Sequence, residues 1–166
     1  NAYGLTETSS TIALLGPDDH AAAFAGDPDA KRRLGSVGKL LPGIEVEVRD
    51  EDDNVLPVGE PGLVFLRGEQ ISGEYDQGSV IDADGWFPTK DRGWVDADGY
   101  LFIEGRADDT IIRGGENIYC IQVESVLYEH PAVTDAAVVG IPHRTLGEEP
   151  GAIVHLKAGT TVTEDE

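Results

Sequence analysis

Near the start of the chain, one short run holds side chains of three chemically useful kinds. Tyr3 offers a flat aromatic face, Thr6 a hydroxyl and Glu7 a carboxylate, and Gly4 lies among them. A ring can stack on a planar group, a hydroxyl can hydrogen-bond an anion, and a carboxylate can bind a hard cation. A plain loop is the competing interpretation, because Tyr-Gly-x-Thr-Glu alone is only moderately specific.

Two further groups of residues follow in the second half of the chain. Asp91 is a carboxylate able to accept two hydrogen bonds at once, and Arg106 is a strong donor. Taken separately they would be a turn carboxylate and a surface arginine. Gly114 and Gly115 form the other group, where the backbone could lie close to a thin substrate chain.

The elements that must position these residues are mainly strands. Apolar periodicity and β-branched residues predict strands at 44–48, 62–67, 94–95, 100–103, 110–113, 133–141 and 152–156. Helical spacing from Ile121 to Leu127 predicts a helix that stops at Pro131. The fold class expected is α/β in the broad sense, a mixed α+β chain with a β-rich part followed by an α/β part.

Other chemistries fail on spacing. The Asp-x-Asp-Gly turns lack the glycine and glutamate that an EF-hand needs at its sixth and twelfth positions. The run Gly35-Ser36-Val37-Gly38-Lys39 has too few residues between its glycines for a Walker loop. The four histidines lack metal-ligand spacing, and Cys120 is the single cysteine, so a disulfide within the chain is excluded.

The overall charge bears on partners and location. A formal charge of −20, from 32 acidic and 12 basic residues, disfavours nucleic acid and anionic membranes as partners. The sequence has no apolar run long enough to span a membrane and no secretory signal at Asn1, so a cytoplasmic location is expected.

Taken in order, three segments make the chain resemble the adenylate-forming (AMP-binding) enzymes, in their acyl-CoA ligase branch. The segments are 1–8, 85–106 and 105–118. The resemblance implies that Tyr3 stacks on adenine with Asn1 and Ala2 at its border. It also implies that Thr6 and Glu7 are catalytic, through the α-phosphate and Mg²⁺ respectively.

The same resemblance assigns the other candidate site residues. Asp91 would accept hydrogen bonds from the ribose hydroxyls of ATP or AMP, with Ile103 and Arg106 completing that site. Asp108 would be the pivot between domains, and Gly114 and Gly115 would line the path of the coenzyme A pantetheine. The implied domains are 1–104, the end of the large AMP-binding domain; 105–109, the hinge; and 110–166, a truncated small domain.

The chain departs from the family pattern at three positions. Lys90 stands where glycine is common, Cys120 where proline is common, and Gln122 where glutamate is common. The change at Lys90 affects the expected path of the loop that carries Asp91. A nucleophilic role for Cys120 is rejected, because no histidine is spaced to serve as its base.

The function implied is ATP-dependent activation of a carboxylic acid, with a fatty acid as the expected acid, followed by transfer to coenzyme A. We expect a fragment of a longer protein that does not form acyl-adenylate by itself, because a phosphate loop and a catalytic lysine are not found. A homo-oligomer is compatible with exposed strand edges. The alternatives are a peptide-synthetase type of adenylation domain and a non-catalytic nucleotide-binding or scaffold module.

Overall fold

The computed structural model describes residues 1–72, 74–75 and 78–163. The chain forms two compact units, Asn1–Ile103 and Glu104–Glu166, and each has its own sheet and its own buried residues. Strands with a few helices make up both units, which confirms the mixed α/β class. The division falls within one strand, β9 (Tyr100–Arg106), and the hinge assigned to 105–109 stays a prediction.

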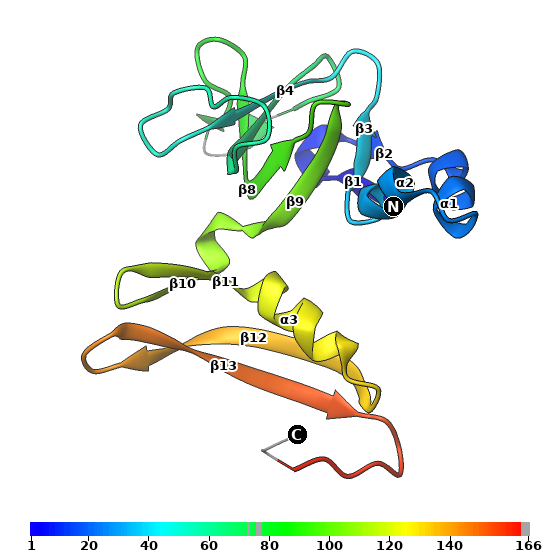
Figure 1. Cartoon of the computed structure of the whole chain (residues 1–166). Helices are drawn as coiled ribbons and strands as arrows, with labels where there is room; N and C mark the ends of the chain where they lie inside the picture. Colours follow the sequence, from blue (N-terminus) through cyan, green and yellow to red (C-terminus); the bar gives the residue numbers. More distant parts are fainter. Residues whose placement is uncertain (73, 76–77, 164–166) are drawn as a thin grey trace. The chain divides into compact units, whose positions relative to one another are not determined.

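A sheet of seven strands forms the first unit, in the order β1-β2-β3-β9-β8-β5-β4 (Figure 1). Its members are β1 (Ala2–Gly4), β2 (Thr11–Leu14), β3 (Gly38–Leu40), β4 (Glu45–Arg49), β5 (Gly62–Arg67), β8 (Phe87–Val95) and β9. A two-stranded pair, β6 (Glu74–Tyr75) and β7 (Gly78–Ser79), is separate from it. The predicted strands at 44–48 and 62–67 correspond to β4 and β5.

The first 40 residues contain more regular secondary structure than was predicted from the sequence. Besides β1, β2 and β3 they form α1 (Pro17–Phe24) and α2 (Pro28–Arg33). The starting signals were present, since proline occupies the first helical position of both helices, and the Asp27 side chain caps α2 by accepting from the Ala30 amide at 2.9 Å. The apolar residues between these signals are small, so the helical periodicity is weak.

Three turns of the first unit repeat one arrangement around an aspartate. Oδ1 of Asp50, of Asp82 and of Asp96 each accepts hydrogen bonds from the backbone amides two and four residues later, at 2.8–2.9 Å. These carboxylates therefore close turns, as was predicted for Asp82 and Asp96 when their spacing excluded calcium loops. Within the described residues, the structure has no group of three acidic, histidine or cysteine side chains arranged to hold a metal ion.

The core of the first unit lies along the centre of its sheet. Seven buried apolar side chains form the main cluster: Ile12, Ile44, Val64, Leu66, Ile71, Phe87 and Leu101. Each such side chain contributes roughly 1.5–3 kcal/mol to folding when it is fully buried. A second cluster contains Tyr100 and Phe102, and the Phe102 ring stacks on Trp94 with centroids 4.1 Å apart. These clusters fix β8 and β9, which carry Asp91 and Ile103.

A four-stranded sheet in the order β11-β10-β13-β12 and one helix form the second unit. The elements are a 3₁₀ turn at Ala107–Asp109, β10 (Thr110–Arg113), β11 (Glu116–Tyr119), α3 (Cys120–Glu129), β12 (Val133–His143) and β13 (Gly147–Leu156). α3 packs against β12, and its Glu124 Oε1 accepts from the Val138 amide at 2.9 Å. The predicted helix corresponds to α3, whereas β11 was missed.

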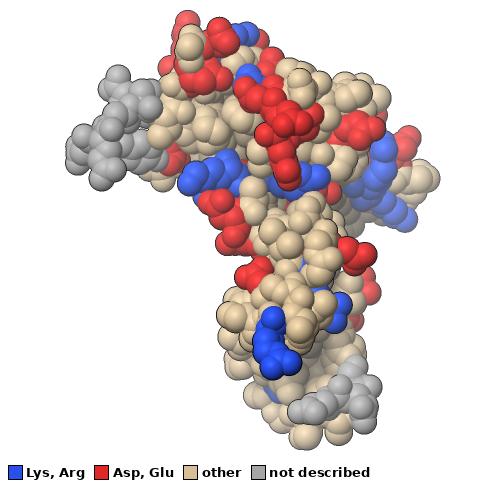
Figure 2. Space-filling view, turned by 90° about the vertical axis from the view of Figure 1, so that its left-hand side faces the viewer, with Lys and Arg blue, Asp and Glu red and all other residues tan. Residues whose placement is uncertain are grey.

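Charged side chains are unevenly distributed between the two units on the face seen in Figure 2. Acidic groups are prominent on the first unit, and the second unit shows few charges there. Several apolar side chains of the second unit are exposed, among them Val126 and Ile153 at 65% and 69%. Among the described residues, no helix has both the length and the apolar character required to span a membrane.

Candidate functional site

A surface hollow of about 430 Å³ lies at the loop that joins β1 to β2. Ala2, Tyr3 and Thr6, three residues singled out in the sequence, are among those that line it. Thr6 is exposed and Tyr3 and Glu7 are half-buried, so all three can be reached by a ligand. The backbone carbonyl of Glu7 accepts from the Ser72 amide at 2.7 Å, which anchors the loop to the segment after β5.

Thr8 shapes this loop, a role that was not predicted from the sequence. It is fully buried, its Oγ1 accepts from the Leu5 amide at 2.9 Å, and the carbonyls of Leu5 and Ser10 lie 2.8 and 2.7 Å from that oxygen. Gly4 serves the same loop, because a Cβ there would lie 2.4 Å from the Ser10 carbonyl oxygen. In the sequence, Thr8 follows directly after Thr6 and Glu7. Its residue type alone does not distinguish a buried threonine from one at the surface.

The hydroxyl of Tyr3 donates a hydrogen bond to Oδ2 of Asp91. In the sheet order, β2, β3 and β9 separate the two strands that carry these residues. Four strand spacings in a flat sheet would be about 19 Å, further than a tyrosine side chain reaches, so the sheet must curl. The curl brings the predicted adenine-stacking residue and the predicted ribose acceptor to one place.

A bulge in β8 carries Asp91. Residues 89–91 lie opposite the single residue Val64, between the pairs Phe65–Pro88 and Leu63–Arg92. Thr89 Oγ1 donates to the Val64 carbonyl at 2.8 Å and accepts from the Asp91 amide at 3.0 Å. The threonine hydroxyl thus replaces a direct backbone bond that the bulge prevents. Thr89 is 3% exposed, and its role was not predicted from the sequence.

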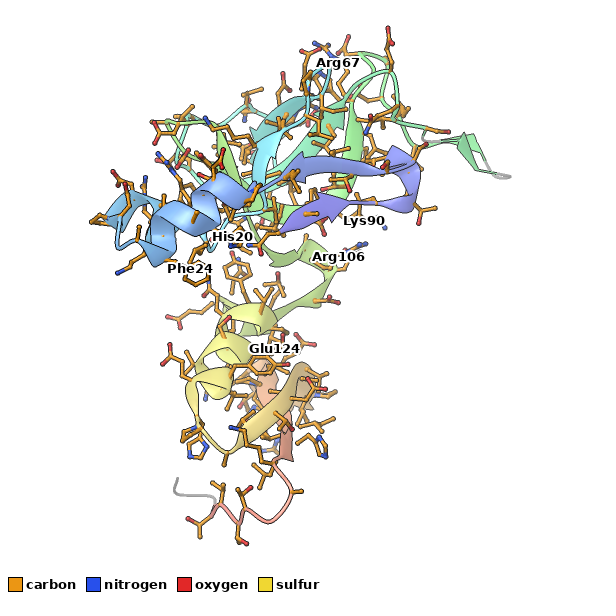
Figure 3. All side chains as sticks on the ribbon, turned by 90° about the vertical axis from the view of Figure 1, so that its right-hand side faces the viewer. His20, Phe24, Arg67, Lys90, Arg106 and Glu124 are labelled. Carbon is orange, nitrogen blue, oxygen red and sulfur yellow. The ribbon has the colours of Figure 1, made fainter. Side chains whose placement is uncertain are left out.

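Lys90, labelled in Figure 3, lies within this bulge. Its backbone is left-handed, with φ of +63°. The family pattern has glycine at this position, and left-handed φ is the reason that glycine suits it. The loop that was expected to carry Asp91 is therefore a strand from Phe87 onward, and the lysine follows the path that the glycine would take. Thr89 and Asp91 are buried while Lys90 is exposed, so the alternation of the strand is kept.

Asn1 and Ile103 have packing roles in the first unit. The Asn1 side-chain amide donates to the carbonyls of Leu34 and Ser36, each at 2.8 Å, and so ties the chain start to the segment before β3. Ile103 is half-buried and packs against the main core cluster. Neither observation tests the assignment of these two residues to an adenosine site, which stays a prediction.

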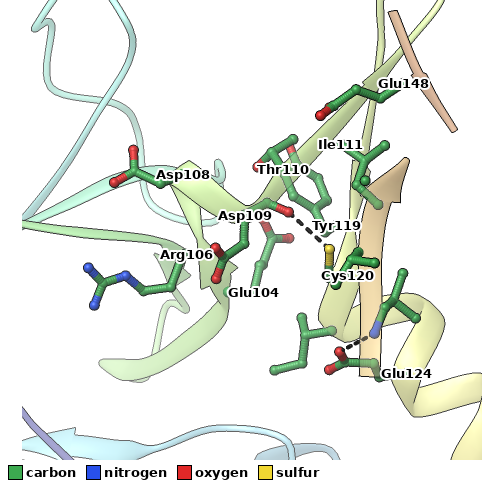
Figure 4. Close-up of a pocket in the computed structure, with 15 residues that line it drawn as sticks. Glu104, Arg106, Asp108, Asp109, Thr110, Ile111, Tyr119, Cys120, Glu124 and Glu148 are labelled. Atoms are coloured by element: carbon green, nitrogen blue, oxygen red, sulfur yellow. Dashed lines mark hydrogen bonds between the residues drawn. The ribbon is translucent and has the colours of Figure 1, made fainter. Parts of the chain in front are cut away.

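Arg106 and Asp108 belong to the second unit. Together with residues of β10, α3 and β12 they line a cavity of about 500 Å³ (Figure 4). Carboxylates are frequent in its lining: Glu104, Asp108, Asp109, Glu124 and Glu148. The predicted actions of Arg106 on ribose and of Asp108 as a pivot stay predictions.

Gly114 and Gly115 form the two-residue turn between β10 and β11. Their φ values are +63° and +91°, as in the tight hairpin turn that favours glycine at both central positions. A Cβ on Gly115 would meet nothing within 4 Å, so the conformation, not crowding, accounts for glycine there. The proposed passage of pantetheine at this turn is a separate prediction.

Cys120 begins α3, and its thiol donates to the Asp109 carbonyl at 3.0 Å. Burial raises the pKa of this thiol, and Glu124, Asp109 and Glu148 raise it further by repelling the thiolate. A raised pKa leaves the sulfur protonated near neutral pH, which agrees with the rejection of Cys120 as a nucleophile.

Two family models match the chain. The AMP-binding enzyme model matches residues 1–76, and the AMP-binding enzyme C-terminal domain model matches residues 122–166. A 2-succinylbenzoate–CoA ligase of Geobacillus sp. (strain WCH70) is 37% identical over 99% of the chain and 32% of its own length. The acyl-CoA ligase sidI of Aspergillus fumigatus is 36% identical over 95% of the chain and 27% of its own length.

Solved structures agree with these matches. The amide bond synthetase McbA from Marinactinospora thermotolerans has a TM-score of 0.85 at 37% identity, covering 99% of this chain and 33% of McbA. The O-succinylbenzoate coenzyme A synthetase MenE from Bacillus subtilis, in complex with AMP, has a TM-score of 0.81 at 34% identity, covering 100% and 32%.

The chain belongs to the AMP-binding enzyme family, and acyl-CoA ligases are among its relatives. It spans about a third of the length of the relatives it matches. The resemblance inferred from the sequence is thereby confirmed at the level of the family.

Proposed function

We propose that this chain supplies the nucleoside-binding part of a ligase that activates a carboxylic acid with ATP and passes the acyl group to coenzyme A. The observation that carries the proposal is the hydrogen bond from Tyr3 to Asp91, beside a hollow lined by Thr6. An aromatic face, a hydroxyl and a buried carboxylate together match the base, phosphate and ribose of AMP. Family membership and the AMP-bound relative MenE support the same ligand.

The reaction consists of two displacements. A carboxylate oxygen of the acid attacks the α-phosphorus of ATP, the bond from that phosphorus to the bridging oxygen breaks, and pyrophosphate leaves. The sulfur of the thiolate then attacks the acyl carbon, and AMP leaves with the electron pair of the C–O bond. Catalysis of both steps depends on positioning and on stabilising charge at the phosphate.

Each residue of the site contributes to binding and orientation. The ring of Tyr3 would lie against adenine, the Asp91 carboxylate would accept from the ribose hydroxyls, and the exposed Thr6 hydroxyl would donate to the α-phosphate. Glu7 would hold Mg²⁺, which neutralises phosphate charge when bound. One carboxylate suits Mg²⁺, because this ion commonly keeps waters and phosphate oxygens as its other ligands.

The chain spans about a third of the length of its relatives, so the acid and the acceptor are proposed from what those relatives are named for. The relatives include a ligase for 2-succinylbenzoate and an amide bond synthetase. We therefore propose an organic acid as the substrate, of which a fatty acid is one class to be tested, and a thiol as the acceptor. An amine acceptor is the second candidate, favoured by the likeness to McbA.

The proposal is tested by pyrophosphate exchange with the protein expressed from the whole open reading frame. A panel of fatty, aryl and dicarboxylic acids is offered with ATP, and product is then measured with coenzyme A or with an amine. Exchange with one acid class and formation of its thioester would support the ligase. Amide without thioester would favour the second candidate, and binding of ATP without exchange for any acid would favour the scaffold alternative.

The assignment of Asp108 as the pivot is tested separately by limited proteolysis. Arg106 and Arg113 are exposed and flank the pivot, so trypsin should cut there first and release two folded pieces. Early cleavage elsewhere, with this segment intact, would contradict the hinge.

A further inference from the structure

We infer that the hydroxyl of Tyr3 is a positioning group, which orients the Asp91 carboxylate so that the protein discriminates for the ribose hydroxyls of its nucleotide. The inference rests on the proposed function and adds a second role to Tyr3, whose ring alone was expected to act. Its basis is the hydrogen bond from the Tyr3 hydroxyl to Oδ2 of Asp91.

Asp91 is 4% exposed, and a carboxylate so far removed from water depends on donors supplied by the protein. Its backbone is fixed by Thr89, whose Oγ1 accepts from the Asp91 amide at 3.0 Å. With the backbone held in the bulge, rotation of the side chain is the remaining freedom of the carboxylate. The Tyr3 hydroxyl restrains that rotation, because it donates a hydrogen bond to one of the two carboxylate oxygens.

The hydroxyl leaves the carboxylate able to bind the sugar. Two carboxylate oxygens together offer about four acceptor positions, so the bond from Tyr3 occupies one of them and is compatible with hydrogen bonds from ribose hydroxyls. Hydrogen bonds to a buried charge are stronger and more directional than those at the surface. Tyr3 therefore prepares the acceptor before the nucleotide arrives, and does not merely block it.

The same unit contains a matched pair that lies outside the proposed site. The hydroxyl of Tyr100 donates to Oδ1 of Asp19 at 2.8 Å, and the Tyr100 side chain is 6% exposed. Arg33 and Lys39 lie over its ring, 4.6 and 4.7 Å from the centroid. Tyr100→Phe removes the same chemical group from a pair of the same kind, and is thus the control for a purely structural effect.

The experiment measures the dissociation constants of AMP and of 2′,3′-dideoxy-AMP for the protein of the whole open reading frame. The wild type should favour AMP. Tyr3→Phe, which keeps the ring, should weaken AMP binding by about tenfold while leaving dideoxy-AMP nearly unchanged. Tyr100→Phe should leave the ratio of the two constants at the wild-type value.

A second comparison uses Asp91→Asn, which removes the charge of the carboxylate that Tyr3 hydrogen-bonds. In that background Tyr3→Phe should cause little further loss of AMP affinity, as expected when two residues act as a unit. The inference is overturned if Tyr3→Phe weakens both nucleotides equally, or if AMP binds the variant as tightly as the wild type. Failure of the proposed function looks different, since the wild type would then bind neither nucleotide or make no distinction between them.

Discussion

Tyr3 and Asp91, 88 positions apart in the sequence, are joined by a hydrogen bond from the tyrosine hydroxyl to the carboxylate. β1 and β8, which carry them, are not neighbours in the sheet. The contact therefore depends on the curl of the sheet that forms the first unit. The bulge at 89–91 sets the position of the aspartate end of this contact. Predictions about the bulge therefore concern both the fold and the proposed site.

The left-handed backbone at Lys90 predicts that glycine would be more stable there. Lys90→Gly should raise the free energy of unfolding by about 0.5–1 kcal/mol, because the strain of a Cβ at positive φ exceeds the entropic cost of glycine. Chemical denaturation measures the change. Lys90→Ala is the control, since it removes the charge and keeps the Cβ, and an alanine variant at least as stable as the glycine variant would contradict the prediction.

Removal of the Thr89 hydroxyl should destabilise the first unit. Thr89→Val keeps the shape of the side chain and leaves the Val64 carbonyl and the Asp91 amide without their common partner. The expected loss is about 1–3 kcal/mol in denaturant unfolding. Thr89→Ser keeps the hydroxyl and should lose only about 0.8 kcal/mol, for one methyl group. Equal stability of the two variants would exclude the bridging role of the hydroxyl.

The Asp82 turn should make folding depend on pH in the acid range. Hydrogen bonds from the backbone amide of Trp86, then that of Asp84, and Arg49 nearby lower the pKa of Asp82. Its folded pKa lies below the unfolded value of about 3.9, so its contribution is present above that value and is lost as the pH falls through the folded pKa. Asp82→Asn should therefore flatten the fall in stability on acidification.

Tryptophan fluorescence can follow this acid transition, because Trp86 belongs to the same turn and its ring lies beneath a charged group. The Cζ atom of Arg67 is 4.5 Å from the centroid of the Trp86 ring. Asp84→Asn, in the same turn, is the control and should leave the slope close to that of the wild type. An unchanged slope in Asp82→Asn would show that the turn carboxylate does not govern the transition.

Cys120 should react slowly with alkylating reagents. Burial and the neighbouring carboxylates raise its thiol pKa, so the iodoacetamide rate should still be climbing where an ordinary thiol, with a pKa of about 8.5, approaches its plateau. Glu124→Gln should shift the rate profile to lower pH, while Glu129→Gln at the far end of α3 should not. A wild-type plateau below pH 8 would contradict the raised pKa.

The high negative charge predicts stabilisation by salt. With a formal charge of −20, repulsion within the folded chain should weaken as sodium chloride is added, and the melting temperature should rise. The gain should shrink as the pH is lowered toward the isoelectric point near 4.3. A gain that is independent of pH would point to general salt effects on hydration instead of screening.

The sequence alone predicted the strands whose residues alternate or are strongly β-branched. β4, β5 and β10 were located in this way because the pattern of their apolar side chains indicates which face of the strand is buried. α1, α2 and β11 were missed, since small or polar residues carry little periodicity over so short a span. The end of β8 was predicted and its beginning was not, because Pro88 and the bulge interrupt the pattern.

The sequence also determined the family, because motifs with fixed residue types in a fixed order can be recognised without a three-dimensional structure. It named Tyr3 and Asp91 separately and left both the contact between them and the parts played by Thr8 and Thr89 unspecified. Those depend on where the curled sheet and the bulge place groups that are distant in the chain. Residue types record which chemistry is available, whereas pairing, burial and backbone conformation decide which groups meet, and only the tertiary structure contains that information.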